Sequence, residues 1–203
     1  MLIPHGRSYD VLSAIFFGGR RRRVFTRLTA LSGACPGDRA LDVGCGTGYF
    51  TRVMARAVVP GGTAVGVDPS REVIARARRL TRIANCTFSE GSAEALDAQG
   101  GSYDVVVSSL MIHHLPEALR PQAIREMFRV LRPGGRLLVA DFLPPTSRVA
   151  RRLISPVINP VMASNPVHLL EPMVREAGFH QVRSGDVRPW IRWVQAVKPT
   201  SAS

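Results

Sequence analysis

Lysine is almost absent from this sequence. Lys198 is the only lysine among 27 basic residues, so arginine supplies nearly all of the positive charge, and the net charge is +12. Such a charge favours a polyanionic partner, either a nucleic acid or an anionic membrane. An arginine bias also follows from genome composition, and the arginines are scattered apart from Arg20–Arg23. The charge alone therefore selects no partner.

Cysteine is scarce as well, with three copies and no C-x-x-C pair. An odd, unpaired set argues against a disulfide framework and predicts free thiols in a reducing compartment, so we expect a cytoplasmic protein. Metal-ligand spacing is missing both around these cysteines and around three of the histidines, so we expect no metal site. The residues concerned are Cys35, Cys45, Cys86, His5, His168 and His180.

We also expect neither a signal peptide nor an uninterrupted membrane span in this sequence. No basic stretch precedes the apolar residues 11–17, as a signal peptide would require. Residues 153–170 contain no Asp, Glu, Lys or Arg, but Pro156, Pro160 and Pro166 interrupt them. This segment therefore predicts an irregular apolar loop instead of a transmembrane helix.

What the sequence does contain is a regular alternation of strand and helix patterns. Apolar runs at 63–67, 86–89, 103–107 and 136–142 predict strands, and Ser70 is placed to cap a helix. Two later helices have apolar stripes at Ile124, Met127, Phe128 and Leu131, and at Leu170, Met173, Val174 and Ala177. The last two apolar runs, around Val182 and at 190–197, favour an antiparallel hairpin. The alternation predicts a doubly wound α/β sheet with ligands at the carboxyl ends of its strands.

The stretch LDVGCGTGYF, residues 41–50, places three glycines directly after a strand that contains Asp42. A dinucleotide-binding G-x-G-x-x-G motif needs a glycine where this chain has Tyr49, and a P-loop needs a Gly-Lys-Ser/Thr ending that is missing. Glycines at 44, 46 and 48 still permit close approach of the backbone to a ligand. The loop therefore suits neither a dinucleotide nor a nucleoside triphosphate.

The pattern D-x-G-x-G-x-G after a strand resembles motif I of the class I S-adenosylmethionine-dependent methyltransferases. Four later stretches are similar to further motifs of that family: Val67-Asp68, Gly91-Ser92-Ala93-Glu94, Tyr103-Asp104-Val105-Val106 and the segment 129–135. The resemblance covers roughly residues 8–198. It implies a single domain with a Rossmann-like, seven-stranded sheet, S-adenosylmethionine as the cofactor, and methyl transfer as the reaction.

The resemblance also implies roles for single residues. Asp42 would take the ammonium end of the cofactor, and Asp68 would accept both ribose hydroxyls. Ser92 stands where the family often has an acidic residue; either it contacts the adenine amino group beside the Ala93 N–H, or it merely starts a turn. The other implied cofactor contacts are Gly44, Cys45, Gly46, Gly48, Pro69 and Ser108.

Three residues are candidates for the methyl-transfer step. His113 and His114 follow the strand 103–107 and suit a general base if the acceptor must lose a proton; the alternative is packing near the cofactor. Tyr9, in a Tyr-Asp pair that is similar to the opening of many such enzymes, either lines the transfer site or packs at a helix start.

We expect an N-terminal helical cap at 1–33, a cofactor-binding core at 34–142, an apolar loop at 143–168 that caps the acceptor, a helix and hairpin at 169–198, and a tail at 199–203.

The order of motifs and the closing PWIRWVQAVKP are most similar to the ubiquinone/menaquinone-biosynthesis and related small-molecule methyltransferases. This likeness implies a small, hydrophobic acceptor, such as a quinone, polyketide or lipid, methylated on carbon, oxygen or nitrogen. A nucleic-acid methyltransferase is the alternative that the charge suggests, although residues 108–111 lack the N-P-P-Y pattern and no separate nucleic-acid-binding module is visible. A non-catalytic cofactor-binding protein is a third possibility.

The arginine cluster Arg20–Arg23 lies between apolar residues. It indicates either a peripheral contact with the inner membrane face or a solvated helix face.

Overall fold

The computed structural model describes residues 19–144, 165–188 and 190–200. The candidate residue Tyr9 and most of the expected acceptor loop at 143–168 lie outside these residues. Within them, no helix is long and apolar enough to cross a membrane.

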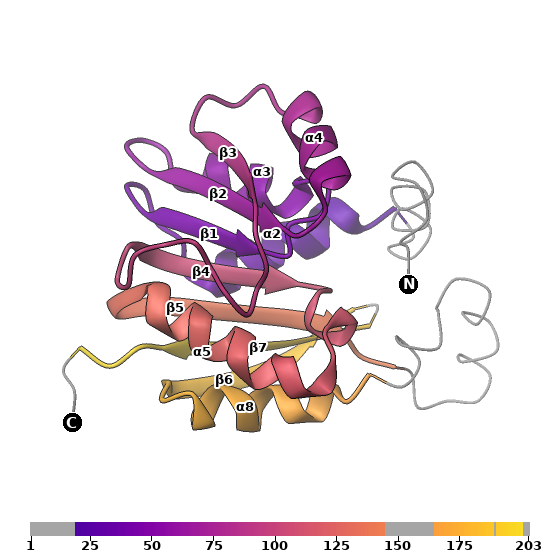
Figure 1. Cartoon of the computed structure of the whole chain (residues 1–203), viewed down its shortest axis with the longest axis vertical. Helices are drawn as coiled ribbons and strands as arrows, with labels where there is room; N and C mark the ends of the chain where they lie inside the picture. Colours follow the sequence, from indigo (N-terminus) through magenta and orange to yellow (C-terminus); the bar gives the residue numbers. More distant parts are fainter. Residues whose placement is uncertain (1–18, 145–164, 189, 201–203) are drawn as a thin grey trace.

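Seven strands form one sheet in the order β3-β2-β1-β4-β5-β7-β6 (Figure 1). The strands are β1 (Arg39–Val43), β2 (Thr63–Asp68), β3 (Cys86–Glu90), β4 (Tyr103–Ser109), β5 (Leu131–Phe142), β6 (His180–Val187) and β7 (Ile191–Val197). The first five pair in parallel, whereas β7 is antiparallel to both β5 and β6. The predicted α/β sheet and its antiparallel C-terminal hairpin are confirmed.

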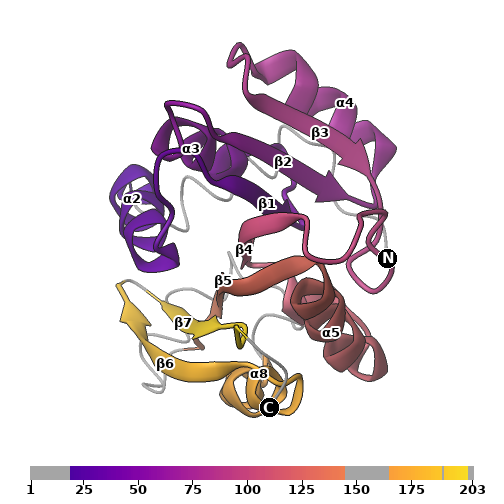
Figure 2. The ribbon, with the colours of Figure 1, turned by 90° about the vertical axis from the view of Figure 1, so that its left-hand side faces the viewer.

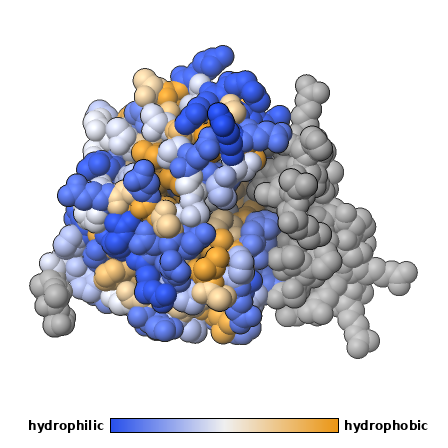
Figure 3. Space-filling model, in the orientation of Figure 1, coloured by the Kyte–Doolittle hydropathy of each residue, from blue (hydrophilic) through white to orange (hydrophobic). Residues whose placement is uncertain are grey.

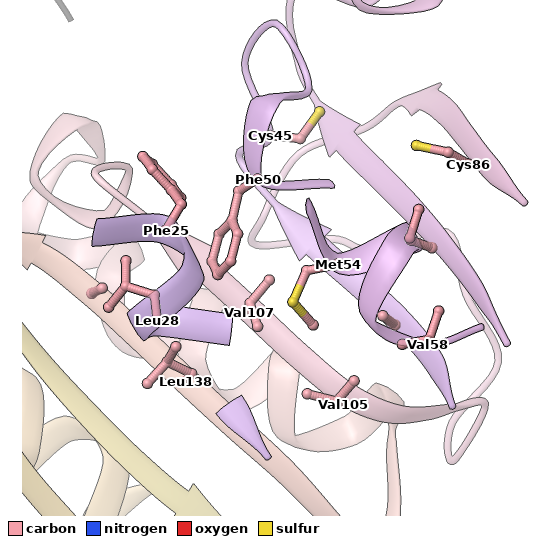
Figure 4. Close-up of a cluster of buried hydrophobic side chains, with 14 of the residues drawn as sticks. Phe25, Leu28, Cys45, Phe50, Met54, Val58, Cys86, Val105, Val107 and Leu138 are labelled. Carbon is pink, nitrogen blue, oxygen red and sulfur yellow. The ribbon is translucent and has the colours of Figure 1, made fainter. Parts of the chain in front are cut away.

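Helices cover both faces of the sheet. One hydrophobic cluster joins it to α2 (Arg21–Ser32), α3 (Tyr49–Ala57) and α4 (Arg71–Leu80), and a second joins it to α5 (Arg120–Val130) and α8 (Leu170–Glu176). Figure 2 shows α2 and α3 on one side of the sheet and α5 and α8 on the other. Figure 4 shows the first cluster, where Leu28, Met54 and Leu138 meet between the helices and the strands. The sheet is therefore covered on both sides, as parallel strands require.

Local sequence signals place most element boundaries. The Ser70 hydroxyl accepts a hydrogen bond from the Val73 N–H at 3.4 Å and caps α4 as predicted. The helical stripe predicted to include Leu131 was wrong at its last residue, because α5 ends at Val130 and Leu131 begins β5. Leu131 has an extended backbone and pairs with Tyr103 across the sheet. Strand pairing therefore outweighs the helical periodicity at this position.

Short 3-10 helices complete the edge where the parallel strands end. They are η1 (Ile112–His114), η2 (Glu117–Leu119) and η3 (Val167–Leu169). The sheet order reverses between β1 and β4, so the loop after β1 and helix η1 after β4 flank the point where ligands bind in doubly wound sheets.

Candidate functional site

Asp42 is a buried carboxylate near the end of β1, with 2% of its surface exposed. Its Oδ2 accepts a hydrogen bond from the Thr51 hydroxyl at 2.6 Å, while its Oδ1 is buried and has no hydrogen-bond partner. Burial raises the pKa of Asp42 to about 7, and the Thr51 hydrogen bond limits the rise. A buried oxygen without a partner is costly, so this position suits a ligand that donates to it.

This raised pKa predicts how the ligand-free protein responds to pH. The folded state keeps the Asp42 proton up to about pH 7, whereas the unfolded chain releases it near the ordinary aspartate pKa of 3.8. The free energy of unfolding should therefore fall as pH rises from about 4 to 7, by an amount on the order of 3 kcal/mol from this group. Denaturant unfolding of wild type and Asp42→Asn across this range measures the effect. A difference between the two proteins that stays constant with pH would contradict it.

Asp68 ends β2, next to β1, and holds the glycine loop in place. Its Oδ2 accepts the Gly46 N–H at 3.1 Å and its Oδ1 accepts the Ser70 N–H at 3.0 Å. Burial raises the pKa of Asp68, and these two hydrogen bonds oppose the rise. Each carboxylate oxygen can accept a second hydrogen bond, so Asp68 can still bind a pair of ligand hydroxyls.

The glycine loop between Asp42 and Asp68 has a conformation that needs glycine. Gly44, Gly46 and Gly48 all have positive φ angles, of 74°, 53° and 78°. A Cβ atom on Gly44 would lie 2.1 Å from the Met111 side chain, and one on Gly48 would lie 2.5 Å from Phe88. The Gly44 and Cys45 N–H groups both donate to the Val67 carbonyl, which fixes the loop to β2. At these three glycines the backbone itself therefore lies between the two carboxylates.

The residues present fit S-adenosylmethionine. An ammonium group can donate to the unpartnered Asp42 oxygen, a ribose diol matches Asp68, and no phosphate-binding side chain is needed. Because β1, β2 and β3 are neighbours in that order, a ligand held by Asp42 and Asp68 places its base at the end of β3. The Gly91 N–H bonds the Asp68 carbonyl at 3.2 Å there, so the loop with Ser92 and Ala93 begins beside the ribose-binding carboxylate.

Two side chains of α5 hold this loop. The Glu126 carboxylate accepts the Leu96 N–H at 2.8 Å, and the Arg129 guanidinium donates to the Leu96 and Ala98 carbonyls at 2.8 and 2.7 Å. The two side chains also bond each other, and the Arg129 guanidinium lowers the pKa of Glu126. Ser92 itself forms a small bridge with Ala95, so its backbone does start a turn, as one of the two interpretations expected.

His113 is buried in η1, after β4, with 2% of its surface exposed. Its Nδ1 lies 2.5 Å from Asp141 Oδ1, and its N–H donates to Asp141 Oδ2 at 3.0 Å. Asp141 is fully buried near the end of β5 and also accepts the Phe142 N–H. The His113 Nε2 is buried and has no hydrogen-bond partner. This pair therefore presents one fixed, unpaired ring nitrogen at the strand ends.

The other sequence candidates differ in their surroundings. His114 is more exposed than His113, and the two ring centroids lie 4.0 Å apart. Partial burial of the ring and the neighbouring His113 lower the pKa of His114 to about 4. Ser108 is fully buried, and its hydroxyl donates to the Val43 carbonyl at 2.9 Å, which ties β4 to β1. Cys45 is buried, whereas Pro69 is exposed at the end of β2.

Asp141 and Thr51 are the functional residues that the sequence reasoning missed. Asp141 stands in the apolar run LLVADF, and a carboxylate in a buried strand is rare without a partner. That signal was present in the sequence. Thr51 gave none, because a threonine in a helix is ordinary and its bond to Asp42 depends on how α3 packs against β1.

Comparisons with known proteins indicate the family of this chain. A methyltransferase-domain family model matches residues 40–135. A Pasteurella multocida protein named ubiquinone/menaquinone biosynthesis C-methyltransferase UbiE is 31% identical over 201 residues, which cover 86% of this chain and 74% of that protein. A Vibrio campbellii protein of the same name is 34% identical over 142 residues, or 68% of this chain. The chain spans only 54% of that relative's length, as it does for several others.

Among solved structures, an Aquifex aeolicus SAM-dependent methyltransferase superposes with a TM-score of 0.73 at 17% identity, and the match covers 93% of this chain and 97% of that one. This likeness supports the fold. Together with the sequence relatives, it leads to one conclusion: the chain belongs to the class I S-adenosylmethionine-dependent methyltransferases.

Proposed function

We propose that this protein transfers the methyl group of S-adenosylmethionine to carbon, oxygen or nitrogen of a small, apolar acceptor. The observation that carries the proposal is the unpartnered, buried Asp42 oxygen one strand away from the Asp68 carboxylate. Asp42 would bind the ammonium group, Asp68 the ribose hydroxyls, and the loop from Gly44 to Gly48 would lie along the ligand between them.

The cofactor supplies a methyl group on a sulfonium, which is already a good leaving group. The protein therefore has to position the acceptor in line with the sulfur and, for a hydroxyl or an acidic carbon, to remove one proton. His113 suits that task because Asp141 bonds its Nδ1 and leaves Nε2 unpaired. The acceptor proton would go to His113 Nε2, and the bound cofactor would supply the methyl group to the acceptor and depart as S-adenosylhomocysteine. Asp141 acts as a positioning residue.

An apolar acceptor is supported by the composition of residues 143–168, which are rich in proline and aliphatic residues. It is also supported by the relatives named for C-methylation in ubiquinone and menaquinone biosynthesis. We propose a quinone, polyketide or lipid-like acceptor, with residues 143–168 and Tyr9 near it.

The domain boundaries given above remain predictions. Three free cysteines support a cytoplasmic location, with contact at the inner membrane face as an addition.

Labelled methyl transfer tests this proposal directly. The protein is incubated with methyl-labelled S-adenosylmethionine and a cell extract, and the extract is then separated into organic, aqueous small-molecule and nucleic-acid fractions. We expect label in the organic fraction, and Asp68→Ala, which should bind the cofactor at least about a hundredfold more weakly, serves as the control for enzyme-dependent transfer. Label confined to the nucleic-acid fraction would contradict an apolar acceptor and indicate a nucleic-acid methyltransferase. Cofactor binding without label in any fraction would indicate a non-catalytic protein.

The α5 contacts predict how the adenine end is recognised. Arg129→Ala removes the donors that hold the Leu96 and Ala98 carbonyls, so the loop with Ser92 and Ala93 loses its support. Affinity for S-adenosylhomocysteine should fall about tenfold, since two or three hydrogen bonds of about 1 kcal/mol each are lost with partial compensation by water.

Discrimination between adenine and hypoxanthine separates this positioning role from a general loss of stability. Calorimetry compares S-adenosylhomocysteine with its hypoxanthine analogue, and the preference for adenine should shrink in Arg129→Ala. Arg125→Ala, an exposed arginine on the same helix, is the matched control and should keep the wild-type preference. An equal loss of affinity for both ligands in Arg129→Ala would argue against the positioning role.

A further inference from the structure

The helices on one face of the sheet carry their charge almost entirely as arginine. Together α2, α3 and α4 contain ten arginines and one acidic residue, Glu72. The helices on the opposite face, α5 and α8, contain four arginines and three glutamates. A genome that favours arginine codons would enrich both faces alike. The difference between the two faces therefore needs another cause.

Many of these arginines are exposed and lie near one another. On α2, Arg23 and Arg27 are one helical turn apart, and Arg20 precedes them by another turn. Like charges at this spacing destabilise a helix. Within the described chain, Arg23, Arg27 and Arg79 have no carboxylate partner, whereas on the opposite face Arg175 pairs with Glu171 and Arg129 with Glu126. The positive charge of these three arginines is not neutralised within the described chain. Their arrangement therefore points to an anion outside the chain.

The three helices pack against one hydrophobic cluster on the same side of the sheet. Phe25 of α2 stacks edge-on against Tyr49 and Phe50 of α3. The Asn85 amide, in the segment between α4 and β3, donates to the Ala55 carbonyl of α3 and to the Gly62 carbonyl just before β2. The arginines of the three helices therefore lie on a broad, common layer on one side of the sheet.

The same layer also exposes aliphatic side chains. Val59, directly after α3, and Leu80, at the end of α4, are each 48% exposed and are two of the three exposed large hydrophobic residues in the described chain. None of the three is aromatic, so the face offers no exposed ring for stacking against nucleic-acid bases. Figure 3 has the orientation of Figure 1, in which α4, α5 and α8 face the viewer; hydrophobic and hydrophilic residues are intermixed over α5 and α8.

We propose that the α2–α3–α4 face docks on an anionic phospholipid surface. Arginine side chains bind lipid phosphates while their methylene stems lie along apolar surface, and the aliphatic residues Val59 and Leu80 add contact with the interface. Each basic residue close to an anionic bilayer contributes about 1 kcal/mol, so several acting together give stable but salt-sensitive binding. The proposal goes beyond methyl transfer and does not depend on it.

Vesicle sedimentation tests the docking. The purified protein is mixed with vesicles of phosphatidylcholine, either alone or with added phosphatidylglycerol. We expect binding only to the anionic vesicles, weakening as salt increases. The double reversal Arg27→Glu/Arg79→Glu should reduce the affinity at least thirtyfold, or about 2 kcal/mol for two lost contacts. Arg125→Glu/Arg183→Glu makes the same change of charge outside this face and should reduce it less than about threefold.

Two outcomes would overturn the proposal. Equal losses in both double variants would show that only the net charge matters, and displacement of the wild-type protein from vesicles by an equal charge concentration of RNA would show that nucleic acid is preferred. Thermal unfolding confirms that each variant is folded. Calorimetric binding of S-adenosylhomocysteine is measured on the same samples and should not change in either variant, so a failure of docking and a failure of cofactor binding are distinguishable.

Discussion

Asp68→Ala is expected to lower the affinity for S-adenosylmethionine at least about a hundredfold. Two ribose hydroxyls would each lose a charge-assisted hydrogen bond, worth about 1.5–3 kcal/mol apiece. The substitution also removes the acceptor for the Gly46 and Ser70 N–H groups, which loosens the glycine loop. Both effects act in the same direction, so this is the largest binding effect that the site predicts.

Calorimetry with S-adenosylhomocysteine measures this effect without any knowledge of the acceptor. Asp68→Asn keeps the shape and one acceptor oxygen, so its loss should be smaller than that of Asp68→Ala. Glu117→Gln is the matched control, because Glu117 is an exposed carboxylate in η2 at the same edge of the sheet. Wild-type affinity in Asp68→Ala would remove the ribose role, and an equal loss in Glu117→Gln would point to the general charge of this edge instead.

His113→Ala is expected to lower the methyl-transfer rate by about 10²–10⁴ for an acceptor that must lose a proton, which is the usual contribution of a general base. Cofactor affinity should stay near the wild-type value, because Asp42 and Asp68 hold the cofactor. Asp141→Asn should also lower the rate, because an amide holds the His113 ring less well than a carboxylate does. His114→Ala, at the exposed neighbouring histidine, is the control and should have a much smaller effect.

An acceptor that is already ionised separates base catalysis from packing. If His113 removes a proton, His113→Ala should retain most of its rate on such an acceptor and lose it on the protonated one. Equal rate losses on both acceptors would support the alternative that His113 only packs near the cofactor. Because His113 and Asp141 are fully or almost fully buried, thermal unfolding and S-adenosylhomocysteine binding must first show that each variant is folded.

Much of the cofactor site could be predicted from the sequence, because its signals are local. The glycines of 44–48 directly follow a strand pattern, Ser70 caps the next helix, and Asp42 and Asp68 each lie at or near the end of an apolar run. Strand periodicity, positive φ and helix capping all act over a few residues. The family resemblance rests on the same short motifs, which is why it specified the cofactor and left the acceptor open.

The sequence by itself thus determined the strand and helix order, the glycine loop and the two carboxylates beside it. Only the tertiary structure decided that Asp141 pairs with His113, 28 positions away, that α5 holds the loop after β3, and that arginines from three helices share one face. Leu131 is a further example: the sequence pattern placed it in a helix, but in the structure it pairs with Tyr103 in the sheet. Such contacts depend on which strands and helices become neighbours, and that order is set by packing of the whole sheet rather than by any short stretch of the chain.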